Sequence, residues 1–142
     1  MKFRDYFSAK QIIFAVVLFA ILIPIAFWDS DTQVKLSYYE EYIYVDTDKY
    51  DMSIRYEDVV SAELTELAEP GEEVEDSWDN DIIRVGIWKN ETWGEYIVCA
   101  DLDCSNCILL QLQDGRILVY SQKDNQTTSE AYATLLTYLP NA

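Results

Sequence analysis

The order of apolar and polar residues divides the chain into one long apolar run near the N-terminus and a series of shorter alternating segments after it. Residues 11–28 read QIIFAVVLFAILIPIAFW and contain no charged side chain. A helix rises about 1.5 Å per residue, so roughly 20 apolar residues cross the hydrocarbon core of a bilayer. This run is just long enough. The sequence therefore predicts a transmembrane helix over 11–28, followed by a polar linker over 29–33.

The charges that flank this run predict its orientation. They are Lys2, Arg4 and Lys10 before it and Asp29 and Asp31 after it. Because basic residues stay on the cytoplasmic side of a membrane helix, we expect residues 1–10 in the cytoplasm and the remainder outside. The chain would then be a single-pass protein of the cell membrane with an extracytoplasmic domain.

Three other interpretations of the apolar run stay open. A cleaved signal peptide also begins with basic residues, although its apolar core is shorter, about 7–15 residues, and ends in small residues. Only Pro24 and Ala26 resemble such an end here. A buried globular helix would need a polar face, which this run lacks. A reversed anchor would place the domain in the cytoplasm. Lipoprotein processing is excluded, since no cysteine lies near the end of the run.

After residue 33, alternation of apolar and polar residues indicates strands that bury one face. The segments that show it are 34–46, 52–56, 61–67, 82–88, 95–101, 107–113 and 116–121. The alternation slips at Glu40 and Glu41, which predicts a bulge or sharp bend inside the first strand. Turn residues over 46–51 and around Asp114-Gly115 predict two antiparallel hairpins. Residues 57–60 are expected to be a short connection.

One segment without alternation joins the third and fourth predicted strands. Residues 68–81 read AEPGEEVEDSWDND, which combines Pro70 and Gly71 with many carboxylates. Such a composition favours a mobile acidic loop. The loop could gather calcium, which takes six to eight oxygen ligands, but it lacks the regular acidic spacing and fixed glycine of a dedicated calcium loop.

The hydrophobic period changes near the C-terminus. Thr127 and Glu130 have the spacing of a capping box. Apolar residues then follow at helical intervals, namely Tyr132, Leu135, Leu136 and Leu139. Pro140 ends the pattern, so we predict an α-helix over about 128–139. The whole pattern predicts one mainly β (α+β) domain over 34–142, a curled antiparallel sheet or barrel of six to seven strands capped by this helix.

Composition narrows the functions that this domain can have. The chain has 26 acidic and 10 basic residues, and its net charge is −16. A field of that sign repels phosphate backbones and anionic headgroups, so neither nucleic acid nor phosphoinositide is expected as a partner. Histidine is absent, which removes the commonest general acid–base and the commonest transition-metal ligand. We therefore expect no enzymatic activity, no cofactor and no metal site.

Cys104 and Cys107 form the only Cys-x-x-Cys pair. They lie between two predicted strands, and no thioredoxin-like βαβ pattern surrounds them. Three interpretations remain: ordinary thiols, a structural disulfide between Cys104 and Cys107 on the oxidising side of a membrane, or redox or metal chemistry. Cys99 alternates with Val98 and is predicted to be a packing residue.

The first predicted strand is rich in tyrosine. Tyr38, Tyr39, Tyr42 and Tyr44 could form an exposed recognition surface, because tyrosine supplies contact area at little cost in entropy. They could equally pack against the sheet or the membrane surface.

Several of these segments together resemble a known family. Residues 84–136 are similar to the C-terminal half of bacterial pleckstrin-homology-like (PH-like) domains. The similarity rests on the strand IIRVGIW, on Trp93-Gly94, on the hairpin CILLQLQDGRILVYS and on the short polar loop before the last helix. IRYEDVV at 54–60 resembles the second strand of that family and its turn into the third. The resemblance covers most of residues 34–139 and lies in spacing and hydrophobicity.

The resemblance implies a fold more than a function. Bacterial members of the family often sit beside membrane helices, whereas eukaryotic relatives bind phosphoinositides through a basic first hairpin. The corresponding turn here, 46–51, carries three aspartates and one lysine, so headgroup binding is not carried over.

Two hypotheses of function follow. The first is a membrane-anchored, non-enzymatic interaction module that binds a protein or envelope partner through an edge strand or the groove between sheet and helix. The alternative is a thiol redox protein that uses Cys104 and Cys107.

Overall fold

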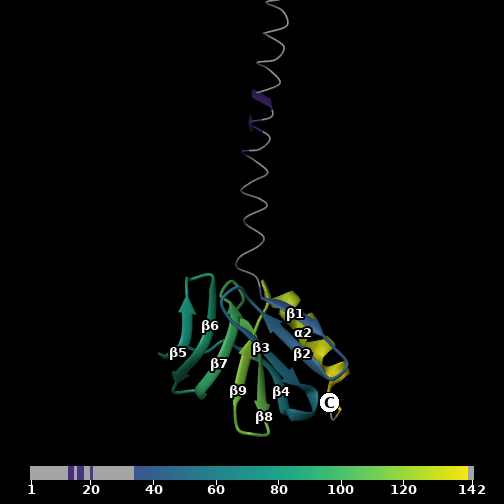
Figure 1. The fold of residues 1–142 in the computed structure, drawn as a ribbon. Helices are drawn as coiled ribbons and strands as arrows, with labels where there is room; N and C mark the ends of the chain where they lie inside the picture. Colours follow the sequence, from purple (N-terminus) through teal and green to yellow (C-terminus); the bar gives the residue numbers. More distant parts are fainter. Residues whose placement is uncertain (1–12, 15, 18–19, 21–33, 141–142) are drawn as a thin grey trace, which may run out of the picture. The chain divides into compact units, whose positions relative to one another are not determined.

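The computed structural model describes residues 13–14, 16–17, 20 and 34–140 (Figure 1). The described residues before 34 are helical and exposed. The rest of the predicted membrane helix, the N-terminal segment 1–10 and the linker 29–33 lie outside the described residues. Among the residues that the structure describes, no helix is long and apolar enough to cross a membrane. The anchor and its orientation therefore stay predictions.

Residues 34–140 form two sheets and one helix. In chain order the elements are β1 (Lys35–Tyr38), β2 (Tyr42–Asp46), β3 (Asp51–Arg55), the 3₁₀ turn η1 (Tyr56–Asp58), β4 (Val59–Glu66), β5 (Glu72–Asp79), β6 (Ile83–Asn90), β7 (Gly94–Asp101), β8 (Asn106–Leu112), β9 (Ile117–Tyr120) and α2 (Asn125–Tyr138). The first sheet has the order β1-β2-β3, and the second has the order β4-β8-β9-β7-β6-β5. The prediction of a mainly β domain with a C-terminal helix packed on the sheet is confirmed.

The predicted strand number and the purely antiparallel sheet are wrong. The described residues form nine strands instead of six to seven, because the first predicted strand is two strands and the acidic segment contains another. Strand β9 lies between β8 and β7 and runs parallel to β7. Strand β4 pairs with β8 rather than with β5, its neighbour in the chain. Alternation reports which face a side chain occupies, and it carries no information on strand order.

The predicted bulge at Glu40 and Glu41 is a complete reversal of the chain. The Tyr39 amide donates a 2.9 Å hydrogen bond to the Tyr42 carbonyl, and the two rings stack with centroids 4.7 Å apart. Strands β1 and β2 therefore pair antiparallel. The slip in alternation arose because two strands meet there at a tight turn.

The predicted mobile loop over 68–81 contains the edge strand β5. Its backbone pairs with β6 through two register shifts, and most of its side chains are exposed. Since almost nothing on β5 is buried, the strand has no hydrophobic period that could reveal it. Close backbone packing holds it instead: a Cβ atom at Gly86 of β6 would overlap the Asp76 carbonyl.

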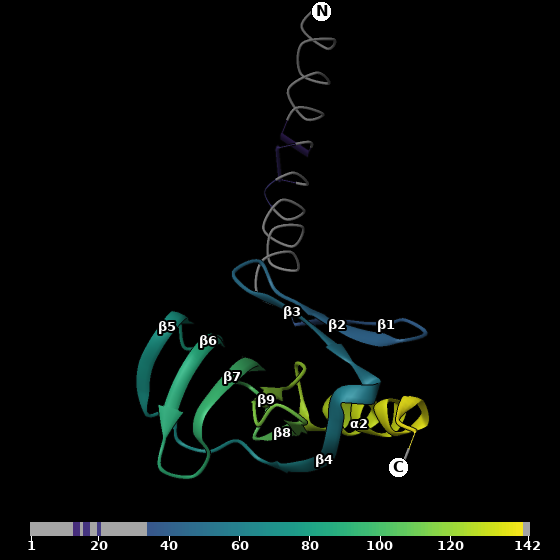
Figure 2. The ribbon, with the colours of Figure 1, turned by 60° about the horizontal axis from the view of Figure 1, so that its bottom comes forward.

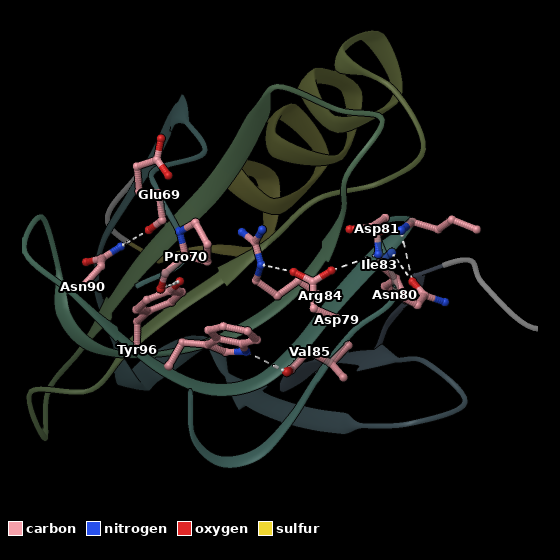
Figure 3. Close-up of polar contacts among 12 residues, drawn as sticks. Glu69, Pro70, Asp79, Asn80, Asp81, Ile83, Arg84, Val85, Asn90 and Tyr96 are labelled. Atoms are coloured by element: carbon pink, nitrogen blue, oxygen red, sulfur yellow. Dashed lines mark hydrogen bonds and ion pairs between the residues drawn. The ribbon is translucent and has the colours of Figure 1, made fainter. Parts of the chain in front are cut away.

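Polar side chains fix the C-terminal end of β5 (Figure 3). Arg84 Nε donates to Asp79 Oδ2 at 2.9 Å, and both side chains are largely buried. The Arg84 guanidinium also lies over the Trp88 ring, 5.6 Å from its centroid. Asn80 Oδ1 accepts the Ile83 amide at 2.8 Å. The strand is thus an ordered part of the second sheet.

The second sheet buries an apolar cluster on each face. One cluster lies between the two sheets and α2, and its fully buried members include Ile43, Ile54, Val85, Leu110 and Leu135 (Figure 2). The other contains Trp88, Tyr96, Val98, Ala100, Cys107, Leu109 and Val119. The connection from β4 to β5 passes over this second cluster, where the Tyr96 hydroxyl donates to the Pro70 carbonyl at 2.8 Å.

Helix α2 begins three residues earlier than predicted. Asp124 is its N-cap in place of Thr127, because Asp124 Oδ1 accepts the Thr127 amide at 2.6 Å. This backbone hydrogen bond lowers the pKa of Asp124, since it favours the carboxylate. The helix ends at Tyr138, one residue before the predicted end at Leu139.

Candidate functional site

An apolar groove lies between the edge strand β4 and helix α2. Its lining residues are Val59, Val60, Ser61, Ala62, Leu136, Leu139 and Pro140, and together they define what we call the β4–α2 groove. Its volume is about 210 Å³, whereas pockets for small-molecule ligands usually enclose roughly 300–1,000 Å³. The groove therefore suits a protruding side chain better than a cofactor.

A bulge in β4 exposes one of the apolar residues that line this groove. Val59 pairs with Leu112 and Ser61 with Gln111, which leaves Val60 without a partner on β8. The Val60 side chain is 64% exposed. Bulges re-aim side chains at sheet edges, so the irregular pairing explains why a valine points outward here.

The opposite wall of the groove is held by contacts along α2. Leu135 is completely buried in the core, whereas Leu136 and Leu139 are only half-buried. The Tyr132 hydroxyl donates a 3.2 Å hydrogen bond to the Ala62 carbonyl of β4. Helix and strand are thus joined directly beside the groove.

A second hollow adjoins the groove around the end of α2. Its lining residues are Glu40, Glu41, Arg55, Tyr56, Glu57, Tyr138 and Pro140, and we call it the acidic hollow. Its volume is about 230 Å³, and it shares Pro140 with the β4–α2 groove. Arg55 is paired with Glu57 at 2.8 Å. No basic side chain among the described residues forms an ion pair with Glu40 or Glu41.

Stacked tyrosines position the last turn of α2 above this hollow. The Tyr138 ring stacks on Tyr38 at 5.3 Å and on Tyr56 at 5.2 Å between centroids. The Tyr38 hydroxyl also donates to the Ala131 carbonyl at 3.2 Å. Burial, together with the neighbouring Tyr56 and Tyr138, raises the pKa of Tyr38 to about 12. The Tyr38 hydroxyl therefore stays protonated at neutral pH.

Two buried tyrosine hydroxyls have no hydrogen-bond partner among the described residues. They belong to Tyr56 and Tyr120, and the Tyr120 side chain is completely buried. Burial raises the pKa of both phenols, so both remain protonated. Neither is a nucleophile or a base at neutral pH.

The structure does not join Cys104 to Cys107. Both are free and buried, as is Cys99. Cys104 Sγ lies 3.0 Å from both the Asn106 carbonyl and Asn125 Oδ1 at the start of α2, and its single S–H can donate to either acceptor. Cys107 packs in the second apolar cluster, and burial raises its pKa to about 12. Burial raises the pKa of Cys99 to about 12 as well. Thiolates at Cys99 and Cys107 are therefore disfavoured at neutral pH.

The carboxylates of the acidic segment 68–81 do not gather into a metal-binding cluster among the described residues. In the part of the chain that the structure describes, no group of three or more potential metal ligands is close enough to hold an ion. A wider hollow of about 640 Å³ lies beside β5, with polar walls made of Glu69, Gly71, Glu72, Lys89, Asn90, Glu91 and Thr92. The carboxylates of β5 follow an extended edge and face solvent.

The predicted tyrosine surface is divided among different environments. Tyr38 packs under α2, whereas Tyr39 is 48% exposed and stacks on Tyr42. The Tyr44 hydroxyl donates to Asp51 Oδ2 at 2.6 Å, and this hydrogen bond raises the pKa of Tyr44 to about 12. Tyr38 thus belongs to the packing of α2, whereas Tyr39, Tyr42 and Tyr44 stay at least partly exposed, and their role in recognition remains a prediction.

Comparison with known proteins adds no family. No protein-family model, no curated protein and no solved structure matches this chain. The geometry of the β4–α2 groove and of the acidic hollow is therefore the basis for assigning a function.

Proposed function

We propose that this chain is a membrane-anchored, non-enzymatic interaction module that binds another protein through the β4–α2 groove. The observation that carries the proposal is the apolar groove beside a free sheet edge, with Val60 exposed in its lining. Exposed apolar surface beside an unpaired strand is a common site for binding an extended segment of a partner.

The predicted anchor and the family resemblance belong to the same proposal. The charge-free run over 11–28, with basic residues before it and aspartates after it, supports a single-pass anchor with the domain outside the cytoplasm. A three-stranded sheet packed on a larger sheet with one C-terminal helix supports a PH-like relationship. The parallel pair β7–β9 is a departure from the curled antiparallel sheet of that family.

The thiol redox alternative has less support. A redox pair needs an accessible thiolate, whereas Cys104 and Cys107 are both buried and burial raises the pKa of Cys107. Neither residue lines the β4–α2 groove.

Site-specific photo-crosslinking tests the interaction surface. A photoreactive phenylalanine analogue is placed at position 60 of the full chain. The chain is then expressed in the organism that encodes it. We expect one discrete protein adduct from position 60. The matched control carries the analogue at Val74, an equally apolar and 48% exposed residue on the other edge strand. No adduct from position 60, or the same adduct from both positions, would contradict the proposal.

Thiol labelling in intact cells tests the anchor separately. Because the native cysteines are buried, a cysteine introduced at the exposed Ala133 provides the reporter. A membrane-impermeant maleimide should label Ala133→Cys in intact cells and leave the native chain almost unlabelled. Labelling only after lysis would place the domain in the cytoplasm.

A further inference from the structure

From the two adjoining hollows we infer the chemistry of the partner: an extended basic segment that places one bulky apolar side chain in the β4–α2 groove and a neighbouring lysine or arginine in the acidic hollow. The inference rests on the proposed function and adds to it the class of ligand. It depends on the continuity of the two hollows, which share Pro140.

The groove half of this surface has the size and polarity for one apolar side chain. Its only polar side chain is that of Ser61, and its apolar walls come from both β4 and α2. Val60, one of its lining residues, offers exposed apolar area. Covering such area contributes about 25 cal/mol per Å², so an apolar anchor gains from docking here.

The acidic half has carboxylates available for a cation. Glu57 is already paired with Arg55, which leaves Glu40 and Glu41 as unpaired carboxylates among the described residues that line the hollow. Tyr56 and Tyr138, whose rings stack with centroids 5.2 Å apart, also line it. A lysine or arginine would meet both a negative field and aromatic surface, and each attracts a cation.

The charge of the whole chain favours the same partner. A net charge of −16 attracts basic segments and repels acidic ones before any contact is made. An acidic or purely apolar occupant would gain from only one of the two hollows. Charge complementarity therefore selects a segment that is both apolar and basic.

Selection from a random dodecapeptide library tests this inference. The full chain in detergent micelles serves as bait at low and at physiological salt. We expect the selected peptides to combine a bulky apolar residue with nearby lysine or arginine. Their affinity should fall as salt rises, because exposed charges are screened. Selection of acidic peptides, or no selection above background, would overturn the inference.

Matched variants connect the selected peptides to the surface. The double variant Glu40→Gln/Glu41→Gln should lose about 2- to 20-fold in affinity, as expected for two exposed ion pairs, and should show a weaker salt dependence. The control Glu72→Gln/Glu73→Gln on β5 removes the same amount of charge. It should change neither the affinity for the peptides nor the salt dependence of binding. Equal losses in both variants would show that net charge alone attracts the peptides.

Two further outcomes separate this inference from the proposed function. Adducts from position 60 without enrichment of basic peptides would keep the interaction module and overturn the ligand class. A synthetic peptide of residues 1–10, which are themselves apolar and basic, is measured in parallel. Binding of that peptide as tight as that of the best library peptides would assign the surface to the chain's own N-terminus and contradict a separate partner.

Discussion

The second sheet has two free edges, and they are built in opposite ways. Strand β4 at one edge exposes Val60 beside an apolar groove, and α2 supports it from one side. Strand β5 at the other edge carries a row of carboxylates. Its pairing with β6 is interrupted by two register shifts, and Asp76 has a positive φ. Charged side chains and bulges are the means by which proteins keep an edge strand from pairing with another chain.

The difference teaches that edge exposure alone does not make a binding surface. Both edges carry an exposed valine, Val60 on β4 and Val74 on β5. Only Val60 lies in a groove with a second apolar wall, which Leu136 and Leu139 provide. The edge β5 is thus protected mainly by its carboxylates, and we propose the edge β4 as the one that binds a partner.

The largest expected effect comes from weakening the packing of α2, which supports the β4 edge. Leu135 is completely buried, so Leu135→Ala should lower the free energy of unfolding by about 2–5 kcal/mol through the cavity it creates. Urea unfolding of the full chain in micelles measures this loss. The control is Leu136→Ala, which truncates the half-buried neighbour in the groove wall. It should lower the free energy of unfolding clearly less than Leu135→Ala does. Equal costs would contradict the assignment of Leu135 to the core.

The packing of β5 against β6 can be weakened by substituting one glycine of β6, Gly86. Gly86 has φ +99°, and a Cβ there would overlap the Asp76 backbone. Gly86→Ala should therefore lower the free energy of unfolding by about 2–4 kcal/mol, because left-handed strain adds to displacement of β5. Gly94→Ala, at φ +71° with open space around it, carries the strain alone. Similar losses in the two variants would mean that β5 does not pack on Gly86.

A charge placed on each edge sharpens the contrast in function. Val60→Glu should weaken binding of the selected peptides at least about tenfold, since it replaces an exposed apolar residue of the groove lining with a carboxylate. Val74→Glu should leave binding unchanged. Both residues are exposed, so each variant should keep its stability within about 0.5 kcal/mol. Fluorescence anisotropy with labelled peptides measures the difference, and equal effects of the two variants would remove the distinction between the edges.

The smallest expected effect is on thermal stability and comes from Asp124 at the N-terminal end of α2. The pKa of Asp124 is lowered in the folded chain, so its capping contribution is present above the ordinary value of 3.8 and is lost as pH falls through the lowered folded value. Asp124→Ala should melt at a lower temperature than the native chain at pH 7, and the gap should close toward pH 2. Asp124→Asn keeps a capping oxygen that does not titrate. A gap that is independent of pH for Asp124→Ala would contradict this role of the carboxylate.

The sequence predicted those parts of the fold in which side chains alternate between core and solvent. The hairpin at Asp114-Gly115 and the C-terminal helix are examples, and both are present. Strand β5 could not be predicted in this way, because its backbone pairs while its side chains stay exposed. The reversal at Glu40 and Glu41 was interpreted as a bulge, since a tight turn and a bulge interrupt alternation equally.

The candidate groove was only partly visible in the sequence. Leu136 and Leu139 were identified in the apolar stripe of the helix, but whether they are core or groove depends on β4, which lies about 70 residues earlier in the chain. Residues 57–60 were predicted to be a connection, although Val59 and Val60 begin β4. No local signal marks Val60 as exposed, because its exposure comes from the irregular pairing with β8.

Hydrogen exchange compares the two edges most directly in their natural setting. Backbone exchange of the full chain is measured in its native membranes and again after purification into micelles. If the β4–α2 groove engages a partner, peptides covering 57–66 and 132–140 should exchange more slowly in the membranes, while those covering 72–79 should not change. Equal exchange in both preparations, or protection confined to β5, would contradict the assignment of β4 as the recognition edge.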